Sequence, residues 1–99
     1  MNLDDLRRLC HNETIKVSQH CMKRIAERGI ELSQVKRAIM EGEIIEDYPE
    51  DFPYPSCLIL GAGIHVVAGV GDGLLWFITA YRPDPGQWED DLKTRKVRL

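Results

Sequence analysis

The stretch SQHCMKRIAERG, from Ser18 to Gly29, carries the signals of a short amphipathic helix with both ends marked. A serine hydroxyl at the first position can accept a free amide proton of the first turn. A glycine just past the last turn permits the left-handed backbone that ends many helices. At about 100° per residue, the apolar residues gather on one face. That face is formed by Cys21, Met22, Ile25 and Ala26, and Lys23 and Glu27 can pair on the outer side.

Three polar residues at intervals of four run along the flank of this helix: His20, Arg24 and Arg28. The helix dipole favours a neutral imidazole in the first turn, and a neutral imidazole suits a general base. Guanidinium groups match the oxygens of a phosphate. The row therefore predicts a surface that engages phosphate. Taken singly, His20 can also be a structural histidine, and each arginine a solvated residue or an ion-pair partner of the acidic residues 41–51.

Composition indicates one globular domain, residues 1–99, with 43% hydrophobic residues, which is enough for a modest core. No apolar run is long enough to span a membrane, and the N-terminus lacks the order of a secretory signal. A cytoplasmic location without a membrane partner is therefore expected. The net charge of −3 argues against strong non-specific binding of nucleic acid. Basic residues nevertheless gather in residues 16–37 and 93–98, and a local basic face can bind phosphates.

Helical spacing, β-branched runs and turn residues predict the remaining elements. Helices are expected at residues 2–10, 18–29, 33–41 (with Ser33 as cap and Gly42 as stop) and 87–95, and strands at residues 14–17, 43–48, 57–60, 64–70 and 74–81. The last strand alternates, with Trp76, Ile78 and Ala80 on one face and Leu75 and Phe77 on the other, which indicates cover on both sides. Short strand connections favour an antiparallel sheet. Helices followed by such a sheet predict an α+β fold.

The last strand also carries Thr79 and Tyr81 on one face near its end, followed by Arg82. Two hydroxyls there can bind a phosphate or orient a catalytic group, although packing at the edge of the core is the commoner role. Tyr81 and Trp88 can stack on a base, but a core position is the commoner one for Trp88.

A metal or cofactor site is not expected. The three cysteines, Cys10, Cys21 and Cys57, form an odd set without paired spacing and are expected to be reduced thiols. The adjacent pairs that include His11 and His20 do not have the spacing of metal ligands. A nucleophilic pair of Cys57 with His65 or His20 is no better supported. The glycines of residues 61–73 precede no helix, so they are not a dinucleotide fingerprint.

Residues 15–30 resemble the opening motif of the DUF4258 family, and later pieces agree in order. These pieces are residues 42–46, Tyr48-Pro49, residues 65–67, residues 78–84, Trp88 and residues 93–96. The similarity spans about residues 14–96. The family in turn resembles the RelE/ParE-like toxins and lies near the small ribonuclease folds. The resemblance implies N-terminal helices packed on a four-stranded antiparallel sheet, and a toxin paired with a small antitoxin protein.

The leading hypothesis is a metal-independent endoribonuclease, in which the RNA 2′-hydroxyl attacks its own phosphate and leaves a cyclic phosphate. The resemblance places the catalytic set on the helix and the last strand. His20 would act as general base or acid, Arg24 and Arg28 would stabilise the charge on phosphate oxygens, Thr79 and Tyr81 would position the phosphate or leaving group, and Lys23 and Arg82 would bind substrate.

The alternative is a binding module without catalysis, or a toxin that blocks a protein target. ParE-like relatives share the fold without cutting RNA, so the fold does not decide the activity. The acidic, proline-broken residues 46–56 would then be the contact surface.

Overall fold

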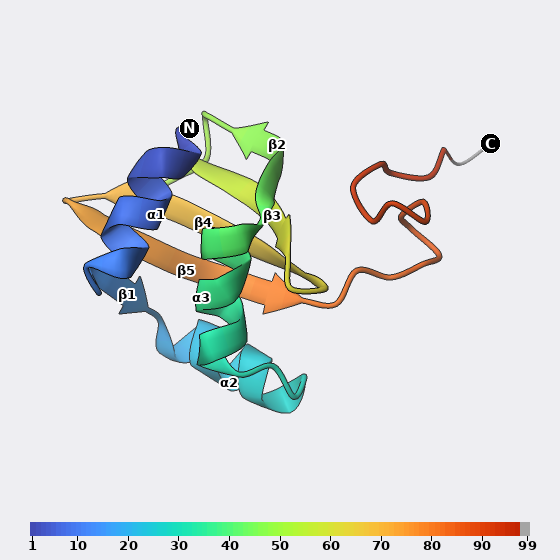
Figure 1. Ribbon diagram of the computed structural model, residues 1–99, viewed down its shortest axis with the longest axis horizontal. Coiled ribbons are helices and arrows are strands. Elements are labelled where there is room, and N and C mark those ends of the chain that lie inside the picture. The colour runs from blue at the N-terminus through green and yellow to red at the C-terminus, as the bar shows by residue number, and fades with distance from the viewer. Residues whose placement is uncertain (98–99) are drawn as a thin grey trace.

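A five-stranded mixed sheet, with strand order β1-β5-β4-β3-β2, forms the centre of the protein in a computed structural model that describes residues 1–97 (Figure 1). The elements in chain order are α1 (Leu3–His11), β1 (Ile15–Val17), α2 (Gln19–Glu27), α3 (Leu32–Glu41), β2 (Glu43–Tyr48), β3 (Ser56–Gly61), β4 (Ile64–Gly71) and β5 (Leu74–Tyr81). The predicted α+β class is confirmed. The predicted four-stranded antiparallel sheet is correct for β2 to β5 but incomplete, because β1 pairs with β5 in parallel. The long connection from β1 to β5 makes a parallel pairing possible.

Helices α1 and α3 cover one face of the sheet and enclose the core between them and the strands (Figure 1). Residues of α1, α3, β3, β4 and β5 are almost fully buried there, among them Leu6, Val35, Ile39, Ile59, Val66, Leu75 and Phe77. Burial of side chains of this size stabilises the fold by roughly 1.5–3 kcal/mol each before entropy is counted. None of the helices in residues 1–97 is long and apolar enough to cross a membrane.

Two tight hairpins connect the last three strands, as the glycine-rich turns predict. Asp72 and Gly73, between β4 and β5, have φ of 55° and 73°, and Ala62 and Gly63, between β3 and β4, have φ of 51° and 75°. Two successive positive φ angles give a turn whose twist matches that of the strands. The predicted bounds are confirmed for β2 and β5, and β3 and β4 are each extended by one or two residues.

Helix α3 begins earlier than predicted. Glu31 occupies the N-cap position without a side-chain cap, so Ser33 as the cap was wrong, and its hydroxyl instead donates to Glu31 Oε2 at 3.3 Å. Gly42 does end the helix as predicted. A glycine suits this position because the backbones of α3 and β3 approach it closely. A Cβ at Gly42 would lie 2.4 Å from the carbonyl oxygens of both Ala38 and Leu60.

A bulge near the end of β5 changes the predicted alternation. Val67 pairs with Thr79 and Ala68 pairs with Phe77, so Ile78 has no direct partner. Ala80 therefore returns to the helix side and is buried, whereas Ile78 is 39% exposed on the other face. The placement of Ile78 and Ala80 on one face was wrong for this reason.

The segment after β5, residues 82–97, contains turns and one isolated bridge between Trp88 and Arg95, so the predicted helix at residues 87–95 was wrong. Side chains here hold the backbone amides in turns. Asp84 Oδ1 accepts from the Gly86 amide at 2.8 Å, and Asp91 Oδ1 accepts from the Thr94 amide at 2.9 Å. Such local bonds compete with helical ones.

Candidate functional site

The local signals of residues 18–29 produce helix α2 as predicted. Ser18 Oγ accepts from the Cys21 amide at 3.0 Å, and Gly29 has φ of 66°. Cys21 and Ile25 are buried and fix which side of the helix faces the protein. His20 is exposed at the start of the helix. The helix therefore presents a free imidazole to solvent from its first turn.

The surface of α2 differs from the prediction at two points. Met22 is 44% exposed and Ala26 is exposed, so the apolar face is narrower than predicted. Glu27 pairs with Arg24, with 3.2 Å between Oε2 and Nη1, and not with Lys23. Both partners of that pair are about half exposed, so it contributes little stability. Lys23 is left exposed one turn from His20.

Arg28 and Thr79, predicted on one site from the resemblance alone, do come together. Arg28 Nη1 donates to Thr79 Oγ1 at 3.3 Å and to the Ala80 carbonyl at 2.8 Å. In return, Arg82 donates to the backbone carbonyls of Arg28 and Gly29. These bonds tie the C-terminal end of α2 to the end of β5. Cations near a helix C-terminus are also favoured by the helix dipole.

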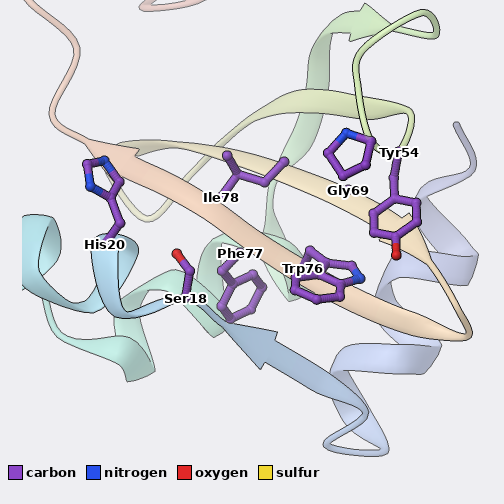
Figure 2. Close-up of a pocket in the computed structure, with 8 residues that line it drawn as sticks. Ser18, His20, Tyr54, Gly69, Trp76, Phe77 and Ile78 are labelled. Atoms are coloured by element: carbon purple, nitrogen blue, oxygen red, sulfur yellow. The ribbon is translucent and has the colours of Figure 1, made fainter.

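His20 lies at the edge of a cavity of about 370 Å³ on the sheet face opposite α1 and α3 (Figure 2). Its lining comes from the start of α2, the loop after β2, and strands β4 and β5, namely Ser18, His20, Pro53, Tyr54, Gly69, Trp76, Phe77 and Ile78. In Figure 2, Ile78 stands between His20 at one end and the rings of Tyr54 and Trp76 at the other. In residues 1–97, no hydrogen bond or ion pair joins the His20 ring to another side chain.

Lys16 stands beside this cavity. It pairs in register with Trp76 across the parallel strands, and paired residues point to the same face of a sheet. Lys16 is exposed, and within the described part of the chain neither Lys16 nor Lys23 takes part in an ion pair. The cavity therefore combines an apolar interior with cations at its margin.

The cavity walls were missed by the sequence reasoning. A signal was present in the two glycines of β4, Gly69 and Gly71, which lie two apart and leave one strand face without side chains. A Cβ at Gly71 would lie 2.1 Å from the Tyr54 ring, so the ring rests directly on the strand.

Tyr81 lies in a different environment, against the buried His65. The two residues pair across β4 and β5, and His65 Nδ1 is 3.4 Å from the Tyr81 hydroxyl. His65 Nε2 donates to the Leu92 carbonyl at 2.6 Å, because a carbonyl can only accept. Burial lowers the pKa of His65 and raises the pKa of Tyr81. Both groups therefore favour their neutral forms in the fold.

The three cysteines are free and buried. Burial raises the pKa of the Cys57 thiol to about 11 and also raises the pKa of Cys10 and Cys21. Cys57 lies in the core under the helices, whereas His65 faces the other side of the sheet, so the two form no nucleophilic pair. Within residues 1–97 no cluster of three potential metal ligands occurs.

The family model described as "Domain of unknown function (DUF4258)" matches residues 17–82. These residues run from the end of β1 to Arg82 and include all of α2 and the strands that line the cavity. Neither the curated proteins nor the solved structures gave a match to this chain. Because the family model covers more than half of the chain and confirms the resemblance seen in the sequence, the protein belongs to the DUF4258 family.

Proposed function

We propose that this protein is a RelE/ParE-like toxin that cleaves single-stranded RNA in the cytoplasm without a metal ion, and that a cognate antitoxin protein restrains it. The observation that carries the proposal is the position of His20, which is exposed beside an apolar cavity with aromatic walls. RNA-binding proteins commonly stack unpaired bases on aromatic side chains. An imidazole at the edge of such a surface can exchange a proton with the RNA backbone.

The chemistry needs only groups that RNA and this chain supply. The 2′-hydroxyl loses its proton to His20 as its oxygen bonds to the adjacent phosphorus. The bond from phosphorus to the 5′-oxygen breaks, and that oxygen takes up a proton from a solvent water as it leaves. A 2′,3′-cyclic phosphate and a 5′-hydroxyl result. Lys23 and Arg24 lie one turn from His20, and their charges would stabilise the oxygens of the pentacovalent phosphate.

Arg28 and Thr79 take supporting roles in this proposal. Arg28 Nη1 is already bonded to Thr79 and the Ala80 carbonyl, so its first effect is to hold α2 against β5. The remaining guanidinium N–H groups are available to a phosphate. Arg82 holds the last carbonyls of α2 and would contact substrate only at the margin. Tyr81 lies beside His65 at the C-terminal end of β5. It would position the leaving group of an RNA strand that runs over this end of β5.

The test is cleavage of end-labelled single-stranded RNA by the full chain in EDTA, alone and in a translating extract. The wild-type protein is expected to release products with cyclic-phosphate ends and to leave DNA of the same sequence intact. His20→Ala is expected to cut about 100-fold more slowly or worse. His11→Ala is the matched control, because His11 is an exposed histidine on α1 that does not line the cavity.

Two results would overturn this function. One is equal cleavage by wild type and His20→Ala. The other is intact RNA under both conditions with a folded wild-type protein.

A binding module is the second candidate, and the exposure of Phe52 favours it. Phe52 lies in the loop between β2 and β3 and is 91% exposed, next to Pro53 and Tyr54 of the cavity wall. An exposed aromatic side chain of this kind is a common anchor in protein interfaces. Growth arrest on expression that persists in His20→Ala and disappears in Phe52→Ser would favour this candidate over RNA cleavage.

A further inference from the structure

The cavity beside His20 has aromatic walls whose polar atoms are already occupied. The Tyr54 hydroxyl donates to Asp72 Oδ2 at 2.6 Å, and Trp76 Nε1 donates to the Gly71 carbonyl at 3.1 Å. The two rings lie 5.6 Å apart with 32° between their planes. What they offer to a ligand is therefore flat apolar surface, held in place before binding.

The floor of the cavity is formed where β4 has no side chain. Gly69 lines the cavity directly, and a Cβ there would lie 3.1 Å from the Pro55 carbonyl and 3.4 Å from Ile78 Cδ1. Trp76 and Ile78 are two residues apart on β5, or roughly 7 Å along the strand. A volume of about 370 Å³ beside these walls is large enough for one planar ring system.

Among the described residues, no lysine or arginine lines this apolar space, and positive charge lies at its margin. Lys16 stands beside Trp76 on the same sheet face, and Lys23 follows His20 on α2. Within residues 1–97, Asp72 is the one carboxylate that forms a hydrogen bond with a lining side chain, the Tyr54 hydroxyl, and Asp72 does not itself line the cavity. A ligand that matches this arrangement has a flat, largely apolar ring and carries its negative charge at the edge of that ring. A nucleotide has this chemistry.

We propose that the cavity binds the base of one nucleotide of a single-stranded RNA, stacked on Trp76, with its phosphate at Lys16 and His20. The placement of the phosphate rests on the proposed function, whereas the stacking of the base does not.

Polar groups that could read a Watson–Crick edge are nearly absent from the lining, because the Tyr54 hydroxyl and Trp76 Nε1 are already bonded and only Ser18 and His20 add further polar side chains. The site therefore accepts any base. It favours purines, because stacking strength and not hydrogen bonding sets the preference.

The test is equilibrium binding of adenosine 3′-monophosphate to the full chain by calorimetry, with cytidine 3′-monophosphate and ribose 5-phosphate as comparison ligands. The adenine nucleotide is expected to bind most tightly and the base-free sugar phosphate about tenfold or more weakly. Trp76→Ala is expected to weaken binding of the adenine nucleotide by about tenfold. Lys16→Gln is expected to weaken binding of this nucleotide a few-fold and to reduce the salt dependence of binding.

Two further variants keep the test independent of folding defects. Ile78→Trp fills the cavity from an exposed position on β5, so it is expected to block binding while the thermal midpoint stays near that of wild type. Lys96→Gln is the matched control for Lys16→Gln, because Lys96 is exposed and lies on the C-terminal segment, which contributes no residue to the cavity lining. Thermal midpoints of all variants would be measured beside the titrations.

Each outcome decides either this inference or the proposed function. Binding that is unchanged in both Trp76→Ala and Ile78→Trp would overturn the base site, as would equal binding of ribose 5-phosphate. So would the absence of nucleotide binding at millimolar concentration, even if the protein cuts RNA. Nucleotide binding that depends on Trp76, in a protein that cuts no RNA, would support the base site and count against the proposed cleavage.

Discussion

The indole of Trp88 stands edge-on to the imidazole of His65, with 4.5 Å between the ring centroids and 89° between the planes. Both side chains are almost fully buried. The Arg95 guanidinium carbon lies over the Trp88 ring, 4.6 Å from the ring centroid. The same guanidinium forms two hydrogen bonds with the Glu46 carboxylate. The segment after β5 thus packs on the sheet face opposite α1 and α3, where it contacts His65 and Glu46.

This attachment makes the stability of the fold depend on pH through His65. Burial lowers the pKa of His65 in the folded protein. Below about pH 6.5, the imidazole of the unfolded chain therefore binds a proton more readily than the buried imidazole of the folded protein. The free energy of unfolding is therefore expected to fall as the pH drops from 7.5 to 5.5, by at most about 1.4 kcal/mol per pH unit. Urea unfolding at these two pH values measures the slope. His65→Gln is expected to flatten it.

His11→Gln is the control for that slope, because His11 is an exposed histidine on α1. It is expected to keep the wild-type dependence between pH 7.5 and 5.5. A slope in His65→Gln as steep as in wild type would contradict the role of the buried imidazole. Below this range a second loss is expected from Glu46, because the hydrogen bonds from Arg95 lower the pKa of its carboxyl and acid removes them.

Arg28 is expected to act as a structural anchor, in contrast to Arg24 on the same flank of α2. Arg28→Gln removes the bonds from Nη1 to Thr79 and the Ala80 carbonyl, and a charged donor of this kind contributes about 1.5–3 kcal/mol. Arg24→Gln removes an exposed pair with Glu27 and is expected to cost less than about 0.5 kcal/mol. Urea midpoints measure both. Equal midpoints for the two variants would show that the bonds of Arg28 contribute nothing to stability.

The features predicted from the sequence are those whose causes are local. Ser18 and Gly29 mark the two ends of α2, and both act through bonds and backbone angles within a few residues. The turn at Asp72 and Gly73 is local in the same sense. These signals fix a helix and a hairpin without knowledge of what packs on them.

Other features depend on residues far apart in the chain, and local patterns cannot specify them. The parallel pairing of Lys16 with Trp76 joins positions 16 and 76, and no local pattern specifies it. The contact between Arg28 and Thr79 joined positions that only the family resemblance had linked. Helical spacing predicts a helix at residues 87–95, but Asp91 accepts hydrogen bonds from nearby amides, and the Leu92 carbonyl turns to His65. Local turn bonds and one long-range contact together overrode the periodic pattern there.

The close approach at Gly42 gives the sharpest test of how α3 joins the sheet. Gly42→Ala would place a methyl group 2.4 Å from the carbonyl oxygens of Ala38 and Leu60, so α3 and β3 must separate. A cost of about 2–4 kcal/mol is expected, which lowers the thermal midpoint by roughly 10 °C or more. Gly63→Ala is the matched control, because Gly63 has φ of 75° but open space around it. It is expected to cost about 1 kcal/mol. Equal midpoints for the two alanine variants would mean that the contact between α3 and β3 does not require glycine at this position, since the φ of −90° at Gly42 is open to any residue.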